Sequence, residues 1–152
     1  MSGETVHQPL THTALAKLSR SVYEKFGDEA LPLITDAWHN IGKKTGSRIM
    51  KKKGINTFRE AAEDHVEMVK GFGDVYEFCH VTDDTYHAQT RPGVPCEVGL
   101  EDAGESVCHA CMAVNTAQFE KIVGAPVEMT ISQSRAMGDN CCEVKYIFKG
   151  RG

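Results

Sequence analysis

The fold is decided by one stretch, Ser106 to Phe148, which reads SVCHACMAVNTAQFEKIVGAPVEMTISQSRAMGDNCCEVKYIF. Its first part, which ends at Gly124, spaces apolar residues as helices do, with interruptions. Residues 127–131 and 142–148 then alternate apolar and polar side chains, which is the period of half-buried strands. We therefore expect broken helix that packs on a terminal β-hairpin.

The residues before this stretch predict helices first and a second hairpin afterwards. Apolar stripes predict helices over residues 11–26, 28–54 and 57–70. Strands are expected at residues 75–81 and 86–91, with a turn signal between them. The predicted fold class is α+β, with N-terminal helices followed by a ββ-αα-ββ unit that forms an antiparallel sheet backed by helices.

Two details of this scheme concern boundaries. Thr57 and Glu60 form a capping box that should open the third helix, and Gly42 and Gly46 should bend or stop the second. Residues 1–10 are expected to be a flexible N-terminal tail, and residues 11–152 a single domain.

The composition of the chain argues against two classes of binding partner, nucleic acid and membranes. The formal charge of −4 argues against nucleic acid, and no apolar run is long enough to predict a membrane span. No secretory signal is recognised, so we expect a cytoplasmic protein with no membrane partner. The basic residues between Lys43 and Lys53 are interpreted as a solvated helix face, in preference to an anion site.

Four of the six cysteines lie in the deciding stretch, and two form the motif Cys108-His109-Ala110-Cys111. A spacing of three residues on a helix brings both sulfurs to nearly the same face, which suits thiolate metal binding or dithiol redox chemistry. Core packing is the alternative, because free cysteines are often buried. A structural zinc site would need further ligands, for which Cys96, His80 and His87 are the candidates.

Two histidines of the first hairpin are expected to face each other. A two-residue loop at Asp83-Asp84 would set His80 opposite His87, with Cβ atoms about 5 Å apart. That distance suits a shared metal, although a one-residue slip would separate them, and two solvated polar residues are the plainer interpretation. His65, in the third helix, is interpreted as a half-buried packing residue.

The second hairpin carries a further prediction about Cys142. A tight turn at Gly138-Asp139 would pair Ile131 with Tyr146 and Arg135 with Cys142. A guanidinium beside a thiol favours the thiolate, which is the nucleophilic form. Packing of an inward strand cysteine explains the same pattern.

This arrangement of elements, and the run Gly138-Asp139-Asn140-Cys141-Cys142-Glu143-Val144-Lys145-Tyr146, resembles the L-2-amino-thiazoline-4-carboxylic acid hydrolase-like family. The layout is also similar to 4-vinyl-reductase-type small-molecule-binding domains. The resemblance covers roughly residues 75 to 149 and implies hydrolytic ring opening of a cyclic amidine-like C–N or C–S bond. It places the family's cysteines on Cys111 and Cys142, with Cys96 a looser match. An acidic residue soon after Cys111 is missing, and Asn115 stands nearby.

The sequence thus predicts a small hydrolase that opens a carbon–nitrogen or carbon–sulfur bond of a heterocycle. Its candidate catalytic residues are Cys111, Cys142, Cys108 and His109, with His80 or His87 as other candidates for the base. The alternatives are a small-molecule or metal-binding sensor module without turnover, and a redox protein using Cys108 and Cys111. The candidate metal ligands for zinc or another divalent ion are Cys96, Cys108, Cys111, His80 and His87. An exposed sheet edge would suit a homodimer.

Overall fold

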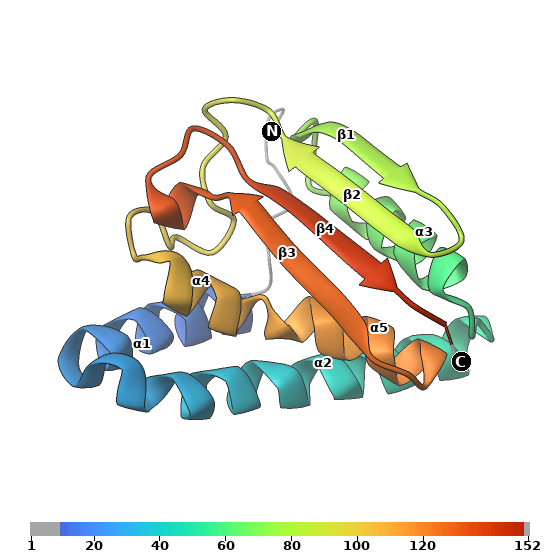
Figure 1. Ribbon diagram of the computed structural model, residues 1–152, viewed down its shortest axis with the longest axis horizontal. Helices are drawn as coiled ribbons and strands as arrows, with labels where there is room; N and C mark the ends of the chain where they lie inside the picture. The colour runs from blue at the N-terminus through green and yellow to red at the C-terminus, as the bar shows by residue number, and fades with distance from the viewer. Residues whose placement is uncertain (1–9, 151–152) are drawn as a thin grey trace.

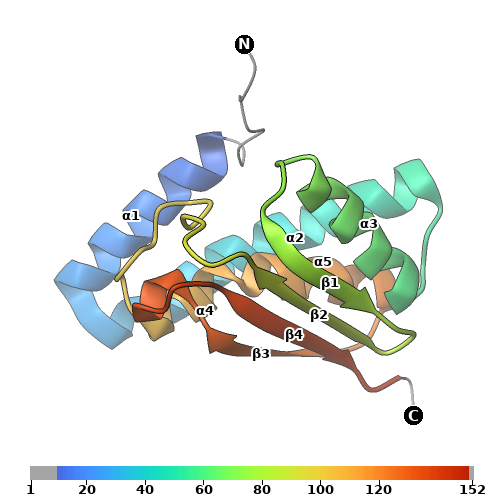
Figure 2. The same cartoon turned by 90° about the horizontal axis from the view of Figure 1, so that it is seen from above.

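The computed structural model describes residues 10–150 and has three layers (Figure 1). A four-stranded antiparallel sheet forms the first layer, and α5 (Ala113–Val123) lies between it and the long helix α2 (Leu31–Lys53). Figure 2 shows α3 (Phe58–Lys70) covering the same face of the sheet near β1 and β2. The α+β class and the order of elements predicted from the sequence are confirmed.

The first two helices form a pair joined by a tight corner. α1 (Leu10–Phe26) is followed by the 3-10 helix η1 (Gly27–Ala30), and α2 begins directly after it. The helix does not stop at Gly42 or Gly46, because α2 is continuous and ends at Gly54, in the left-handed conformation. The two glycines instead let α5 approach closely. A Cβ atom on Gly42 would stand 2.2 Å from the carbonyl oxygen of Val114.

The capping box of α3 is confirmed. The side chain of Thr57 accepts a hydrogen bond from the backbone N–H of Glu60, whose carboxylate accepts one from the N–H of Thr57. The predicted N-terminal tail, residues 1–10, lies outside the described residues apart from Leu10, which begins α1.

The sheet has the strand order β1-β2-β4-β3, so β2 (Thr85–Thr90) and β4 (Glu143–Phe148) are central. The edges are β1 (Tyr76–Val81) and β3 (Val127–Gln133). His80 pairs with His87 as predicted. The homodimer expected through a sheet edge stays a prediction.

The register predicted for the second hairpin is wrong by two residues. Ile131 pairs with Val144, and Tyr146 pairs with Met129. The predicted tight turn is replaced by a longer connection that contains the 3-10 helix η2 (Arg135–Met137). The apolar faces of both strands still agree, because a shift of two residues preserves the alternation.

The helical connection is broken once, as the sequence suggested. α4 (Glu105–Cys111) and α5 are separated only by Met112. Two hydrophobic clusters result, one around Trp38 and Val107 and the other around Phe58 and Phe119. Among the described residues, no helix is long and apolar enough to cross a membrane.

Candidate functional site

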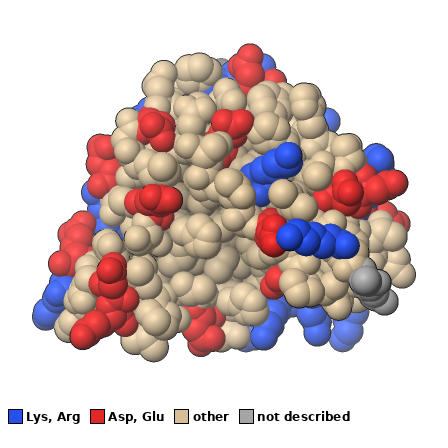
Figure 3. All heavy atoms as spheres, in the orientation of Figure 1, with Lys and Arg blue, Asp and Glu red and all other residues tan. Residues whose placement is uncertain are grey.

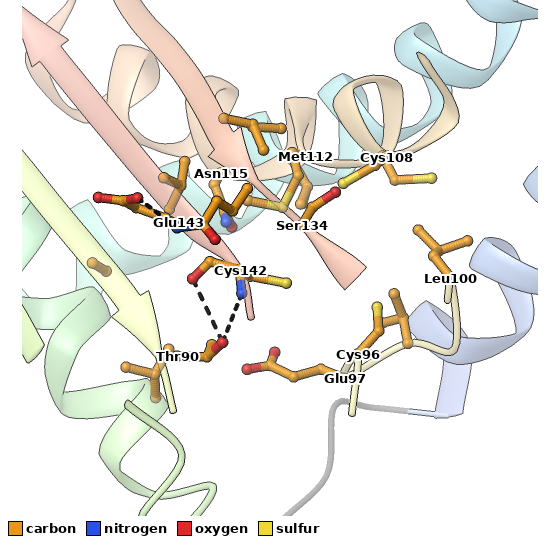
Figure 4. A pocket seen from close by; sticks show the side chains of 18 of the residues that line it. Thr90, Cys96, Glu97, Leu100, Cys108, Met112, Asn115, Ser134, Cys142 and Glu143 are labelled. Atoms are coloured by element: carbon orange, nitrogen blue, oxygen red, sulfur yellow. Dashed lines mark hydrogen bonds between the residues drawn. The ribbon is translucent and has the colours of Figure 1, made fainter. Parts of the chain in front are cut away.

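A pocket of about 150 Å³ lies where the two hydrophobic clusters meet (Figure 4). The sheet, α4, the start of α5 and the loop before α4 all contribute to its wall. Its lining is mostly apolar and includes the only tryptophan of the chain, Trp38. Trp38 is held by a 3.1 Å hydrogen bond from its ring N–H to the hydroxyl of Ser19 on α1. The pocket is therefore assembled from segments that are far apart in the sequence.

Four cysteines line this pocket, namely Cys96, Cys108, Cys111 and Cys142. Figure 4 shows the labelled side chains of Cys96, Cys108 and Cys142 around the same space. Burial raises the pKa of Cys108 to about 11 and that of Cys111 to about 12. These two thiols are thus protonated at neutral pH, and thiolate is the form that attacks a substrate.

Cys142 lies just before β4, so it is not an inward strand residue as the sequence suggested. Arg135 does lie beside it, but the contact is a 3.4 Å hydrogen bond from the backbone N–H of Arg135 to Sγ. The guanidinium instead donates to Asn140. Burial raises the pKa of Cys142 in spite of the backbone donor. The backbone of Cys142 is fixed by Thr90, whose hydroxyl accepts from its N–H at 2.8 Å.

A buried polar cluster interrupts the apolar wall. His65 Nδ1 and the hydroxyl of Tyr86 are 2.8 Å apart, and the amide nitrogen of Asn115 donates to the hydroxyl of Tyr146 at 3.1 Å. Burial lowers the pKa of His65 to about 4, opposed by the nearby charge of Asp64 and a hydrogen bond with Asn115. The imidazole is neutral at physiological pH. Of the four clustered side chains, His65 and Asn115 reach the pocket.

Two further side chains give the pocket its polarity. Tyr76 of β1 lines the pocket. Burial raises the pKa of Tyr76 well above its usual value, and the carboxylate of Glu97 raises it further. Glu97 also lines the pocket and is labelled in Figure 4. The wall therefore offers a neutral phenol hydroxyl near a carboxylate.

The predicted histidines lie elsewhere. His87 alternates with the buried Tyr86 and Ala88 along β2, so it faces away from the helices. Its Nε2 is 2.7 Å from Oε2 of Glu143. His80, its partner across the hairpin, is exposed, and so is His109 on α4. None of the three lines the pocket.

The five predicted metal ligands are therefore not brought together. Three of them are the pocket thiols Cys96, Cys108 and Cys111, whereas His80 and His87 occupy the opposite face of the sheet. Within residues 10–150, no group of three or more His, Cys, Asp or Glu side chains is arranged to hold a metal ion. The dithiol redox role of Cys108 and Cys111 stays a prediction; all six cysteines are free thiols in this structure.

Several pocket residues were not singled out from the sequence as site residues. Trp38, Tyr76 and Asn115 are aromatic or amide side chains that ordinary packing explains equally well. His65 carried a usable signal, because it lies four residues from both Ala61 and Val69 on the buried stripe of α3. A histidine on a buried stripe must be neutral or have a hydrogen-bond partner. His65 meets both conditions, because its pKa is lowered and its Nδ1 contacts the hydroxyl of Tyr86.

Comparison with known proteins shows the fold and no family. No family model and no curated protein matches the sequence. The phenol-responsive sensory domain of the transcription activator PoxR, solved with phenol, matches with a TM-score of 0.61 and 13% identity, over 90% of this chain and 73% of that one. A trafficking protein particle complex subunit 3 from Naegleria fowleri, covalently bound to palmitic acid, matches with a TM-score of 0.55 and 17% identity. That match covers 94% of this chain and 98% of that one. Neither structure is described as a hydrolase of the family that the sequence resembles.

Proposed function

We propose that this domain is a binding module for a small, uncharged aromatic molecule that carries a hydroxyl group. The observation that carries the proposal is the pocket itself, a mostly apolar space with the phenol of Tyr76 and the amide of Asn115 in its wall. Two proteins of the same fold were solved with phenol and with palmitic acid, which supports a ligand-binding use of the fold.

The size of the pocket favours a single ring. Dry cavities of about 150 Å³ in other proteins accept benzene, whereas drug-sized ligands occupy roughly 300 to 1,000 Å³. The pocket here has about 150 Å³. A long acyl chain would need side chains to move. Sulfur atoms also suit an aromatic guest, and Met112 and the four cysteines supply them.

The polar groups of the pocket favour a hydroxyl substituent. A ligand hydroxyl can exchange a hydrogen bond with the phenol of Tyr76 in the pocket wall, and benzene cannot. Asn115 uses one amide hydrogen for Tyr146 and retains a second donor. A ligand carboxylate would be repelled by Glu97, which lines the same pocket.

The test uses the fluorescence of Trp38, the only tryptophan, which lines the pocket. Phenol should change the emission in a saturable way, benzene should bind more weakly, and benzoate should bind weakest. Tyr76→Phe removes the hydroxyl with little change in volume, so it should lower affinity for phenol about 3- to 10-fold and leave benzene unchanged.

Tyr23→Phe is the matched control, because the hydroxyl of Tyr23 bonds to Asp28 on the surface, away from the pocket. It should leave phenol binding unchanged. No saturable signal with any aromatic compound would refute the proposal. Binding of palmitate in preference to phenol would refute the ligand class.

Hydrolysis is a second candidate, supported by four thiols and the imidazoles of His12 and His65 in one pocket. It needs a thiolate, and burial disfavours that form for Cys108, Cys111 and Cys142. Turnover of a cyclic amidine or thiazoline that is lost in Cys111→Ser, Cys142→Ser would establish it. Equal turnover in that double variant would remove both thiols from the mechanism.

A further inference from the structure

The positive charge of this acidic chain is concentrated on one segment. Residues 37–59 hold seven of the 17 Lys and Arg residues and none of the 21 Asp and Glu residues. Most of these cations lie on the C-terminal half of α2, which forms the outer layer of the molecule, away from the sheet. Figure 3 shows Lys and Arg side chains along the lower edge, below the position of that half-helix in Figure 1. The chain therefore has a strongly cationic surface on the C-terminal half of α2, although its net charge is −4.

Helical geometry fixes which cations point outward. Lys44, Arg48 and Lys51 follow one another at spacings of four and three, so they share one face of α2. Gly42 and Gly46 lie on the opposite face, where they are packed against the backbone of α5. Because that packing leaves no room for rotation of the helix, the three cations must face outward. All three are exposed, as are the flanking Lys43 and Lys52.

These cations are not neutralised within the molecule. Lys53 forms an ion pair with Asp64 on α3. By contrast, five exposed cations of α2 form no ion pair with any residue between 10 and 150. They are Lys43, Lys44, Arg48, Lys51 and Lys52. We call these five residues the cationic stripe. Its charge is available to an outside partner.

An exposed leucine continues the same face toward the start of α2. Leu33 precedes Lys44 by three helical turns, through Ala37 and Asn40, at spacings of four, three and four. Its side chain is 73% exposed, the highest value among the large hydrophobic residues described. Water is an unfavourable surrounding for such a side chain. The outer face of α2 therefore carries one exposed leucine near its start and the cationic stripe near its end.

We propose that the outer face of α2 docks onto a membrane surface that contains anionic phospholipids. The stripe would lie over the head groups, and Leu33 would enter the boundary between head groups and acyl chains. Nucleic acid fits less well, because four of the five cations are Lys and no exposed aromatic residue lies on this face to stack on bases. The proposal goes beyond the interpretation of the run as a solvated face, and it departs from the expectation of no membrane partner. It involves contact with a surface and no membrane span, and it does not depend on the pocket.

The test is co-sedimentation with vesicles of phosphatidylcholine alone, or of equal parts phosphatidylcholine and phosphatidylglycerol. The chain should bind only the anionic vesicles, and added salt should weaken binding. Lys44→Gln, Arg48→Gln, Lys51→Gln should lower the partition coefficient roughly 100-fold, since each charge near an anionic surface contributes about 5-fold. Leu33→Ser should lower it about 5-fold without changing the salt dependence.

The matched control is Lys17→Gln, Lys25→Gln, Lys145→Gln, which removes the same charge from exposed positions outside the stripe. It should retain binding within about 2-fold of the original. Circular dichroism of each variant establishes that the fold is retained. Equal loss in both triple variants, equal binding to neutral vesicles, or no binding to anionic vesicles would overturn the proposal. Binding of an RNA oligomer that needs the stripe, with no vesicle binding, would also overturn it and assign the stripe to nucleic acid.

Discussion

Substitution of Gly42 by alanine tests the close packing of α2 on α5 most directly. The new Cβ atom would lie 2.2 Å from the carbonyl oxygen of Val114 and 2.8 Å from the Cβ atom of Ala117. The first of these contacts is with backbone, so no side-chain rotation relieves it. Overpacking of this kind costs about 1 to 3 kcal/mol, and a backbone clash belongs at the upper end. Alanine also has a higher helix propensity than glycine, which offsets about 1 kcal/mol of this loss. We expect a net loss of about 2 kcal/mol.

The measurement is urea unfolding followed by far-UV circular dichroism, with the melting temperature as a second readout. A loss of about 2 kcal/mol corresponds to a decrease of roughly 4 to 8 °C for a domain of this size. Gly46→Ala should be milder, because its nearest contacts are 2.8 and 2.9 Å. Gly71→Ala is the control at an exposed helix end and should change stability by less than about 0.5 kcal/mol. If Gly42→Ala were as stable as the original chain, close packing would not be the reason for glycine here.

Three other predictions concern the pocket. The pKa of His65 is lowered to about 4 in the folded protein, against 6.5 in the unfolded chain, so the unfolded chain binds the extra proton first. The free energy of unfolding should therefore fall by about 3 kcal/mol as the pH drops from 6.5 to 4, and unfolding titrations of His65→Phe should lack that component. Ala88→Leu should fill part of the pocket and abolish the phenol signal of Trp38, whereas retained binding would place the ligand elsewhere. Iodoacetamide labelling followed by mass spectrometry should find Cys108 and Cys111 at least 100-fold slower than a free thiol at pH 7, because burial raises their pKa; fast labelling would contradict this.

The local signals of the sequence were reliable where one residue type has one structural use. The capping box of Thr57 and Glu60 begins α3, and the turn at Asp83-Asp84 sets His80 against His87. Both depend on hydrogen bonds within a few residues. The period of the strands likewise identified the buried faces of β3 and β4.

Gly42 shows why the sequence alone does not predict a continuous second helix. Glycine weakens an isolated helix, and the sequence contains only that local preference. The contact with Val114 depends on where α5 lies, and tertiary packing overrides the preference. The register of β3 against β4 failed for a similar reason. Nothing in residues 134–142 identifies a 3-10 turn, and the observed pairing differs by two residues from the pairing that a tight turn predicts.

The sequence predicts some residues of the candidate site and misses others. The pairing of Cys108 with Cys111 on one helix face brought two pocket residues into view. Tyr76 and Trp38 enter the pocket only through the packing of β1 and α2 against distant segments, which no local pattern encodes. For Cys142 the sequence leaves a thiolate and ordinary packing open, and burial raises the pKa of its thiol, which favours the protonated form.

The strand order has a consequence for how the chain reaches this fold. Each hairpin, β1-β2 and β3-β4, pairs neighbours in the sequence, so each can close early. The central contact of β2 with β4 joins partners such as Gln89 and Glu143, which are more than fifty residues apart. Closing so long a loop is the slow kind of step in folding. The seam between β2 and β4 is therefore expected to form last, and the pocket would be completed only when the two halves of the sheet join.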